Sequence, residues 1–288
     1  MIDYLAIGHV TEDLPGTLGQ QPEGSTPGGT VTYASRTARA FVSQVAVLTA
    51  AAAGMDIYAA FPNIDACCIE APTTTQFRNI YVAGGRIQVV SPCPIVLQPD
   101  HLTDAMRASR IMHLGPVCNE ISPDMVRHAS PNTFIGITPQ GWMRRWDEQG
   151  HVDSRAGNWV DAELILSHAH AVVTSIDDVA GDWSVAHRWA AQTRLLIVTQ
   201  GPLGCTAFFD GQELHTPAPQ TQEVESTGAG DIFAAALFIA LQRGDTVRDA
   251  CALANCIGAQ SVTRPRLAGI PTNADTRLAT LCLPTPLQ

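Results

Sequence analysis

The stretch that decides the fold reads Glu225-Ser226-Thr227-Gly228-Ala229-Gly230-Asp231 and continues directly into the apolar run Ile232–Leu241. Ten apolar residues are about half of the twenty that a membrane-spanning helix needs. A helix that is apolar on all sides is typical of a protein core. Arg243 and Gly244, residues common at helix ends, follow the run. The sequence therefore predicts a buried helix whose N-terminus lies at Thr227–Asp231.

The N-terminus of this predicted helix suits a negatively charged group. The amides of a helix's first turn lack intrahelical partners, and the aligned peptide dipoles add a partial positive charge there. The small residues Gly228, Ala229 and Gly230 leave these amides unobstructed, as phosphate binding requires. Asp231 lies beside them, where a carboxylate can accept a proton from an attacking hydroxyl. Phosphoryl transfer needs positioning, charge stabilisation and a base; an Asp that only stabilises the first turn of a core helix is the alternative.

Composition narrows the chemistry further. The chain has 288 residues, of which 45% are hydrophobic and 15% charged, which is typical of a globular protein. All 17 basic residues are Arg, and no Lys is present. Schiff-base enzymes, lysine-linked pyridoxal phosphate and Walker A nucleotide binding are therefore excluded. Because the net charge is −10 and no Arg-rich run occurs, we expect no nucleic-acid partner.

The remaining composition concerns the setting of the protein. The eight cysteines form no CxxC pair, and Met1–Tyr4 shows no basic start of a signal peptide. No apolar run is long enough to cross a membrane. We therefore expect a cytoplasmic protein with no membrane partner.

Short apolar strands alternate with helices along the chain, a pattern that favours a mostly parallel sheet covered on both faces. The expected strands are Tyr4–Gly8, Gln44–Leu48, Ile111–Leu114, Phe134–Ile137, Ala171–Thr174 and Leu195–Thr199. The expected helices are 29–42, 102–108, 122–130, 183–192, 229–243, 247–262 and 273–281.

Two segments, 10–27 and 66–96, do not follow this alternation. Within the second, Thr73–Val82 and Arg86–Val90 flank the turn Ala83-Gly84-Gly85, which predicts a β-hairpin. We expect the two segments to form a small β-sheet at one edge of a single domain spanning 1–288; a pair of surface loops is the alternative. An exposed edge of such a sheet offers a route to a homodimer.

The chain resembles the PfkB/ribokinase family of small-molecule kinases, and the resemblance runs from residue 4 to about 272. Five motifs of that family occur here in the same order. They are Gly8-His9-Val10-Thr11-Glu12-Asp13, Gly28-Gly29, Thr199-Gln200-Gly201-Pro202-Leu203-Gly204, Glu225 through Asp231, and Ala254-Asn255. The resemblance implies a three-layer α/β/α sandwich with a mostly parallel central sheet and a small β lid.

The resemblance also implies the roles of individual residues. Asp231 is the catalytic base, and the amides of Gly228, Ala229 and Gly230 form the anion hole. Substrate hydroxyls are bound by Asp13, Gly28, Gly29 and Tyr33, of which Asp13 is expected at the C-terminal end of a strand. ATP is bound by Thr199, Gly201, Gly204, Thr227 and Asn255. Mg²⁺ bridges the ATP phosphates, and we assign Glu225 and Asp178 to it.

The chain departs from the family pattern at several positions. Tyr33 stands where many sugar kinases carry an Asn that contacts the sugar. The family's Asn-x-x-Glu, which organises metal-bound water, is here Ser175-Ile176-Asp177-Asp178, and Thr138-Pro139-Gln140-Gly141 replaces a more typical Asp-Pro-Asn stretch. These changes argue against ribose as the substrate, and Gly-Gly-Thr-Val-Thr-Tyr is closer to inositol kinases.

Other candidate sites have weaker support. His168-Ala169-His170 lacks a further metal ligand at a suitable spacing, and Cys67-Cys68 reads as packing in a strand. Arg144-Arg145 reads as a solvated face rather than a phosphate site.

Together these observations predict an ATP-dependent kinase that phosphorylates a hydroxyl of a sugar or cyclitol, a small polyhydroxylated substrate. Two alternatives stay open. Tyr33 favours a nucleoside kinase of the same fold, since an aromatic ring can stack on a base. The altered Ser175 and Asp178 favour a catalytically weak member that binds a nucleotide or sugar.

Overall fold

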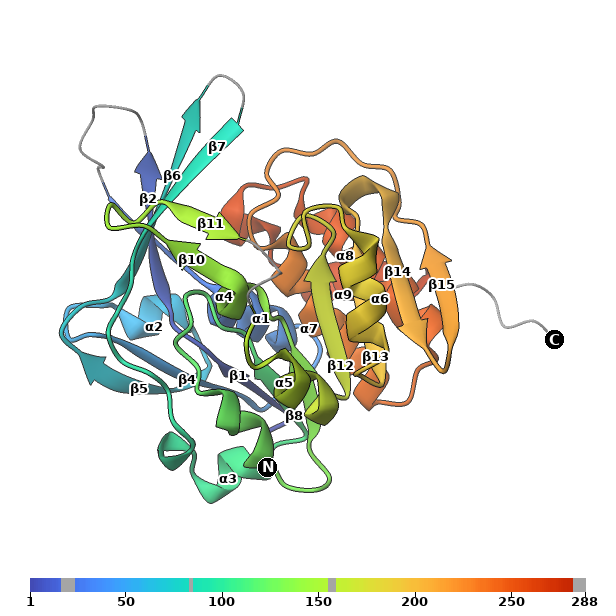
Figure 1. Ribbon diagram of the computed structural model, residues 1–288, viewed down its shortest axis with the longest axis horizontal. Helices are drawn as coiled ribbons and strands as arrows, with labels where there is room; N and C mark the ends of the chain where they lie inside the picture. Colours follow the sequence, from blue (N-terminus) through green and yellow to red (C-terminus); the bar gives the residue numbers. More distant parts are fainter. Residues whose placement is uncertain (17–23, 83–84, 155–158, 282–288) are drawn as a thin grey trace.

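A nine-stranded sheet forms the centre of the protein, with helices on both of its faces (Figure 1). The computed structural model describes residues 1–16, 24–82, 85–154 and 159–281. In spatial order the strands are β15 (Gln212–Thr216), β14 (Cys205–Phe209), β13 (Leu195–Thr199), β12 (Ala171–Ser175), β9 (Phe134–Ile137), β8 (Ile111–Leu114), β1 (Tyr4–Ile7), β4 (Val45–Ala52) and β5 (Asp65–Ala71). From β5 to β13 all neighbours are parallel, whereas β14 pairs antiparallel with both β13 and β15.

Two hydrophobic cores lie on the two faces of this sheet. One is formed with α1 (Thr30–Arg39), α7 (Ala229–Gln242) and α8 (Val247–Ser261). The other is formed with α3 (Asp104–Arg107), η2 (Pro123–Arg127), α5 (Ala162–His168) and α6 (Trp183–Ala190). The remaining helices are α2 (Ile57–Ala60), η1 (Pro99–His101), α4 (Gln140–Met143), η4 (Gly201–Leu203), η5 (Arg266–Gly269) and α9 (Asn273–Leu281). The three-layer α/β/α prediction is confirmed.

Helix α7 is the central helix of the first core, as its uniformly apolar sequence predicts. Every residue from Ile232 to Ala240 is buried, and a helix buried on all sides needs no polar face. At 14 residues it is far shorter than a bilayer is thick, and no helix among the described residues has the length and apolar character to span one.

A separate four-stranded sheet projects from the main body, at the upper left of Figure 1. Its order is β3 (Thr26–Gly28), β2 (Thr11–Gly16), β6 (Thr75–Val82) and β7 (Gly85–Ser91). We refer to this sheet as the lid. On its inner side Phe77 and Val90 pack against Val117 and Cys118, which belong to the loop after β8.

A hairpin of β10 (Arg144–Trp146) and β11 (Val152–Ser154) lies beside the lid. The amide of Val90 in β7 donates to the carbonyl of Gly150 at 2.8 Å, and Val89 forms a bridge with His151. The hairpin therefore links the lid to the segment that follows β9.

Several expectations about the elements need correction. The expected lid segment 66–96 begins too early, because β5 (Asp65–Ala71) pairs in parallel with β4 at the edge of the main sheet. Segment 122–130 is a short 3₁₀ helix, η2, that starts at Pro123. Residues 17–23 of the other lid segment and the turn residues Ala83 and Gly84 lie outside the described residues.

Candidate active site

The N-terminus of α7 combines a left-handed glycine with open amides. Gly228 precedes the helix with φ of +80°, and a Cβ at this position would lie 2.3 Å from Cδ1 of Tyr33. Only glycine combines that φ with such a close approach. Among the described residues, the amides of Gly228 and Gly230 have no hydrogen-bond acceptor, whereas the amide of Ala229 donates to the Ser226 carbonyl at 3.1 Å. The expected three-amide anion hole is therefore open at two amides, and the space around Gly230 is free.

Asp231 lies in the first turn of α7 and is partly buried. Burial raises the pKa of its carboxyl to about 6, and the nearby Asp178 and Asp13 carboxylates act in the same direction. A hydrogen bond with the Thr30 hydroxyl and the charge of Arg144 oppose this rise. A carboxyl with a pKa near 6 is ionised at neutral pH yet basic enough to accept a proton from a substrate.

Asp13 lies inside the lid strand β2, and not at the C-terminal end of a main-sheet strand as expected. The difference arises because β1 ends at Ile7, so the chain has already entered the lid at Asp13. The Thr11 hydroxyl donates to Oδ1 of Asp13 at 2.8 Å, and burial raises the pKa of the Asp13 carboxyl. The lid thus brings this carboxylate near Asp231.

Two glycines allow the chain to pass close to this carboxylate. A Cβ at Gly28 would lie 2.3 Å from Oδ2 of Asp13. Gly29 has φ of +83° and precedes α1, and a Cβ there would lie 2.5 Å from the carbonyl oxygen of His9. Both positions exclude any side chain, so the backbone itself lines this part of the site.

Tyr33 connects the two halves of the site. Its side chain is only 3% exposed and lies against Gly228. Burial raises the pKa of its hydroxyl well above the ordinary value, and the charges of Asp13 and Asp231 add to the effect. These shared interactions bring Asp13, Tyr33 and Asp231 into one site.

Three of the residues expected to bind ATP, Thr199, Gly201 and Gly204, lie at the junction of β13 and β14. Thr199 ends β13, and its hydroxyl donates to the Thr174 carbonyl at 3.3 Å. Gly201 and Gly204 have φ of +56° and +98°, and a Cβ at Gly204 would lie 2.2 Å from the Thr216 carbonyl oxygen. Thr227 is partly buried just before α7.

Asn255 on α8 has a different environment from the one expected of a nucleotide-binding side chain. It is buried, and its amide nitrogen donates to the carbonyls of Thr216 at 2.9 Å and Pro217 at 3.4 Å. In this arrangement Asn255 anchors the end of β15.

The two carboxylates assigned to Mg²⁺ are already engaged with protein groups. Glu225 lies 3.7 Å from the Arg266 guanidinium. Asp178 is 8% exposed, and it accepts hydrogen bonds from the Gln140 side chain at 2.9 Å and the Ser175 amide at 3.0 Å. Neither belongs to a group of three ligand atoms within the described residues. The two carboxylates therefore do not form a ready-made metal site.

One group with metal-ligand chemistry does occur among the described residues, formed by His9, Cys118 and Glu120, and all three are buried. The Glu120 carboxylate accepts the backbone amides of His9, Val117 and Cys118 at 2.7–3.0 Å. Thr75 lies 3.0 Å from Nδ1 of His9. These contacts satisfy the carboxylate and Nδ1 of His9, and they join the loops after β1 and β8. Nε2 of His9, by contrast, is buried without a hydrogen-bond partner among the described residues.

Sequence reasoning missed two arginines. Arg144 is 8% exposed, and its guanidinium donates to the Val117 carbonyl at 2.9 Å and to Oε1 of Gln140 at 2.7 Å. The interpretation of Arg144-Arg145 as a solvated face is thus wrong for Arg144 and holds only for Arg145, which is exposed. The absence of Lys from the sequence could have pointed to a buried Arg, since any permanently charged cation in the site had to be Arg.

Arg266 is the second missed arginine. Its guanidinium donates to the Thr26 hydroxyl in the lid at 2.9 Å and also lies near Glu225. Its charge lowers the pKa of Asp13, against the dominant effect of burial. Arg266 therefore connects the lid to the segment before α7.

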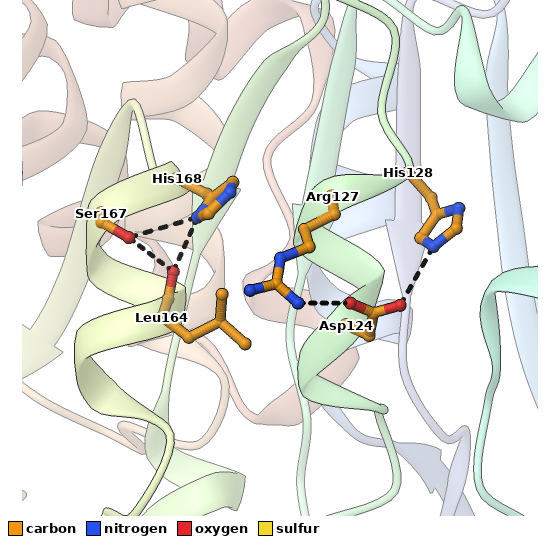
Figure 2. A network of polar contacts seen from close by, with 6 residues as sticks. All are labelled: Asp124, Arg127, His128, Leu164, Ser167 and His168. Carbon is orange, nitrogen blue, oxygen red and sulfur yellow. Dashed lines mark hydrogen bonds and ion pairs between the residues drawn. The ribbon is translucent and has the colours of Figure 1, made fainter.

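The two histidines of the His168-Ala169-His170 segment make separate contacts. Figure 2 shows the His168 ring directed at its own helix, where Nδ1 lies 2.9 Å from the Leu164 carbonyl and 3.2 Å from the Ser167 hydroxyl. The neighbouring Asp124 in the same view pairs with Arg127 and His128. His170 instead accepts the Ile135 amide at 3.0 Å. Cys67 and Cys68 lie in the edge strand β5.

A cavity of about 830 Å³ is lined by lid residues, Val90 among them, and by the β10–β11 hairpin. Its lining includes Glu12, Gln76 and residues 146–150. Side chains alternate between the two faces of a strand, so Glu12 and Gln76 point away from the face that carries Asp13 and Phe77. The cavity is therefore separate from the candidate active site.

Comparison with known proteins supports a kinase family. Residues 149–273 match the model of the pfkB family carbohydrate kinases. A probable fructokinase-4 from Arabidopsis thaliana is 23% identical over 199 residues, covering 63% of this chain and 61% of that protein. The match therefore spans about three fifths of the length of that relative.

Solved structures share the fold over almost the whole chain. A pyrophosphate-dependent kinase of the ribokinase family, complexed with a pyrophosphate analogue and myo-inositol, has a TM-score of 0.79 at 18% identity and covers 96% of this chain and 99% of its own. Arabidopsis thaliana ribokinase complexed with ribose and ATP has a TM-score of 0.72 at 13% identity, with 97% and 99% covered. A pfkB family carbohydrate kinase domain is thus detected in residues 149–273, and the fold is that of ribokinase-family kinases.

Proposed function

We propose that the protein transfers a phosphoryl group to a hydroxyl of a small sugar or cyclitol. The observation that carries this proposal is the position of Asp231, a carboxyl with its pKa raised to about 6 beside two open amides at the start of α7. The relatives support the substrate class, since they are a probable fructokinase and kinases crystallised with myo-inositol or ribose.

The chemistry follows from this placement. The acceptor hydroxyl gives its proton to Asp231 while its oxygen forms a bond to phosphorus, and the bond between phosphorus and the leaving oxygen of the donor breaks. The amides of Gly228 and Gly230 and the positive end of α7 stabilise the negative charge of the transferred group. Asp13 binds further hydroxyls of the acceptor, and the closed lid excludes water that would hydrolyse the donor.

We propose ATP as the donor, bound along Thr199, Gly201, Gly204 and Thr227. Mg²⁺ stays a prediction, because Glu225 and Asp178 are engaged with Arg266 and Gln140 and do not form a metal site on their own. No step of the proposed chemistry is assigned to the metal.

Pyrophosphate is a second candidate donor. The hydrogen bonds of Asn255 to the Thr216 and Pro217 carbonyls take up the amide that was expected to contact the nucleotide. A pyrophosphate-dependent kinase also shares this fold. Pyrophosphate has no nucleobase and therefore needs only the anion-binding part of the site, which the amides of Gly228 and Gly230 provide.

The nucleoside alternative has less support from the geometry. Stacking on the nucleobase of a nucleoside requires an exposed aromatic face, whereas the Tyr33 side chain is 3% exposed and lies against Gly228. A weak sugar- or nucleotide-binding role remains a distinct outcome of the assay below.

The assay measures phosphorylated product for fructose, ribose, myo-inositol and adenosine, each with ATP or pyrophosphate and with Mg²⁺ or EDTA. We expect turnover with a sugar or cyclitol and with one of the two donors. Binding of a donor without turnover on any acceptor would support the weak-binding role instead, and preference for adenosine would support the nucleoside kinase.

Replacing Asp231 by Asn tests the base directly. We expect Asp231→Asn to lower kcat by about 10²- to 10⁴-fold, the usual contribution of a general base, with donor affinity nearly unchanged. Steady-state kinetics at pH 8 measure kcat, and calorimetric titration measures the donor affinity. Turnover close to that of the wild type would contradict the proposed role.

Replacing Asp13 by Ala tests whether this carboxylate binds the acceptor. We expect Asp13→Ala to raise the acceptor KM by about tenfold or more, because hydrogen bonds to a charged group contribute roughly 1.5–3 kcal/mol. The donor KM should change little. An equal rise of both KM values would show that Asp13 supports the lid structure and does not bind the acceptor.

A further inference from the structure

Glu120 is a buried carboxylate whose hydrogen-bond donors among the described residues are all neutral backbone amides. The residue is 2% exposed. Oε1 accepts the amides of His9 and Val117, and Oε2 accepts those of Val117 and Cys118, at 2.7–3.0 Å. Neutral donors solvate a negative charge but do not balance it, and buried charges in proteins are normally paired or bound to a metal ion. The charge of Glu120 therefore points to a cationic partner.

The carboxylate also keeps room for such a partner. A carboxylate has about four lone-pair sites. Only three amide groups donate to Glu120, because the single Val117 amide is shared between the two oxygens. One lone pair therefore stays available without loss of any existing hydrogen bond.

His9 supplies a second donor atom. Its side chain is fully buried, and Nε2 has no hydrogen-bond partner among the described residues. Nδ1 lies 3.0 Å from the Thr75 hydroxyl. A histidine that binds a metal through one nitrogen normally donates a hydrogen bond through the other. The Thr75 hydroxyl can accept that bond from Nδ1, which leaves the lone pair of Nε2 for an ion.

Cys118 supplies a third donor atom, from the same loop as Glu120. Because β1 and β8 are neighbouring parallel strands, the loops after them meet at one edge of the sheet. One ligand atom from each of His9, Cys118 and Glu120 lies within 4.8 Å of the other two. Ligands that bind zinc at about 2.0–2.3 Å are about 3–4 Å apart, so small movements of buried side chains bring the three atoms to bonding distance.

We propose that His9, Cys118 and Glu120 form a zinc site next to the lid. A set of sulfur, nitrogen and oxygen ligands suits Zn²⁺, whereas Mg²⁺ and Ca²⁺ prefer oxygen ligands alone. On binding, the S–H bond of Cys118 breaks, the proton leaves to solvent and the thiolate sulfur bonds to the ion. The two charges of the ion are then balanced by one thiolate and one carboxylate.

The position of the site gives it a structural role that does not depend on the proposed function. Cys118 and Val117 pack against Phe77 and Val90 on the inner side of the lid. An ion that joins the loops after β1 and β8 holds this support in place, and it stabilises the folded chain because the unfolded chain does not offer the same site.

Cobalt(II) is a suitable probe, because its bonds to thiolates give a charge-transfer band in the near ultraviolet that nitrogen and oxygen ligands do not give. The full-length protein is freed of metal with EDTA. Since the three residues are buried, Co²⁺ is added to the folded protein and, in a second sample, during refolding from urea. We expect one Co²⁺ per chain with this band, and we expect Zn²⁺, but not an excess of Mg²⁺, to displace it.

Substitutions locate the ion. Cys118→Ser should abolish the band and lower the Zn²⁺ affinity by more than about 100-fold, because even the partners of metal ligands contribute about 10- to 100-fold. Cys93→Ser is the matched control, since it changes another buried thiol of the neighbourhood, whose backbone amide donates to Thr75; the band and the affinity should stay unchanged. If Cys118→Ser does not fold, His9→Gln keeps the thiol and should lower the Zn²⁺ affinity to a similar extent.

A stability readout accompanies the spectra. Zn²⁺ should raise the midpoint of urea denaturation of the wild type with increasing concentration, and it should have no such effect on Cys118→Ser. The proposal fails if the wild type shows no thiolate band in either sample, which includes binding to surface histidines only. It also fails if the band persists in Cys118→Ser or is lost in Cys93→Ser. None of these measurements requires turnover, so they are decided separately from the proposed kinase activity.

Discussion

At the scale of single residues, the contact between Gly228 and Tyr33 joins the start of α7 to α1. Gly228 has a left-handed backbone, and the Tyr33 ring occupies the place where a Cβ would be. The residue that starts α7 thus also determines where the Tyr33 side chain lies. A change at Gly228 is therefore expected to affect both the helix start and the acceptor side.

We expect Gly228→Ala to lower the free energy of unfolding by about 1–3 kcal/mol, because the new residue keeps a strained φ and displaces the Tyr33 ring. Urea denaturation measures the change. Gly230→Ala is the matched control for stability, since a Cβ there contacts nothing within 4 Å. Equal stabilities of the two variants would show that the ring moves without cost.

The residues near α7 were accessible to sequence reasoning because they are neighbours along the chain. Gly228, Gly230 and Asp231 lie within four positions, and helix geometry alone places them together. Arg144 was not accessible, because its burial depends on Val117 and Phe77, which only the folded chain brings to it. The amide of Ala229 was misjudged for a local reason, the turn that points it at Ser226.

At the scale of elements, the strands with continuous apolar sequences were the predictable ones. β1, β8 and β13 are buried on both faces, so their composition alone identifies them. The edge strands β5 and β15 are only partly buried. Both carry charged residues, so their sequences lack the continuous apolar run of a central strand. The β10–β11 hairpin docks on the lid through the Val90–Gly150 hydrogen bond, the Val89–His151 bridge and the packing of Trp146 and Val152 against the cluster that contains Phe77 and Val90.

We expect Gly150→Ala to release the hairpin from the lid. Gly150 has φ of +80°, and a Cβ there would lie 2.4 Å from the Val90 carbonyl oxygen. A local cost of about 1–3 kcal/mol should speed hydrogen exchange of the Val90 amide by about tenfold or more, since 1.4 kcal/mol corresponds to a factor of ten. Gly54→Ala, at an open position, is the control; unchanged protection of Val90 in Gly150→Ala would refute the expected release.

At the scale of the whole molecule, the buried Asp231 carboxyl lowers the stability of the folded protein by an amount that depends on pH. The folded-state pKa of Asp231 is about 6, above the ordinary 3.8. The folded protein therefore holds this proton more tightly than the unfolded chain, so its contribution to stability declines as pH rises from about 4 to 6. The burial that raises the pKa of Asp231 also makes the folded protein less stable at neutral pH.

We expect Asp231→Asn to unfold at a higher denaturant concentration than the wild type at pH 8, by about 1–3 kcal/mol in free energy. Near pH 4 the difference should disappear, because the wild-type carboxyl is then protonated in the folded protein. Denaturation curves at both pH values measure this. A difference of the same size at both pH values would mean that the gain does not come from the charge.

The tether from Arg266 to Thr26 spans 240 positions of the chain. The lid strand β3 is thus tied to a residue that is synthesised long after it. During synthesis the lid strands emerge from the ribosome early, but this bond cannot form until residue 266 has emerged as well.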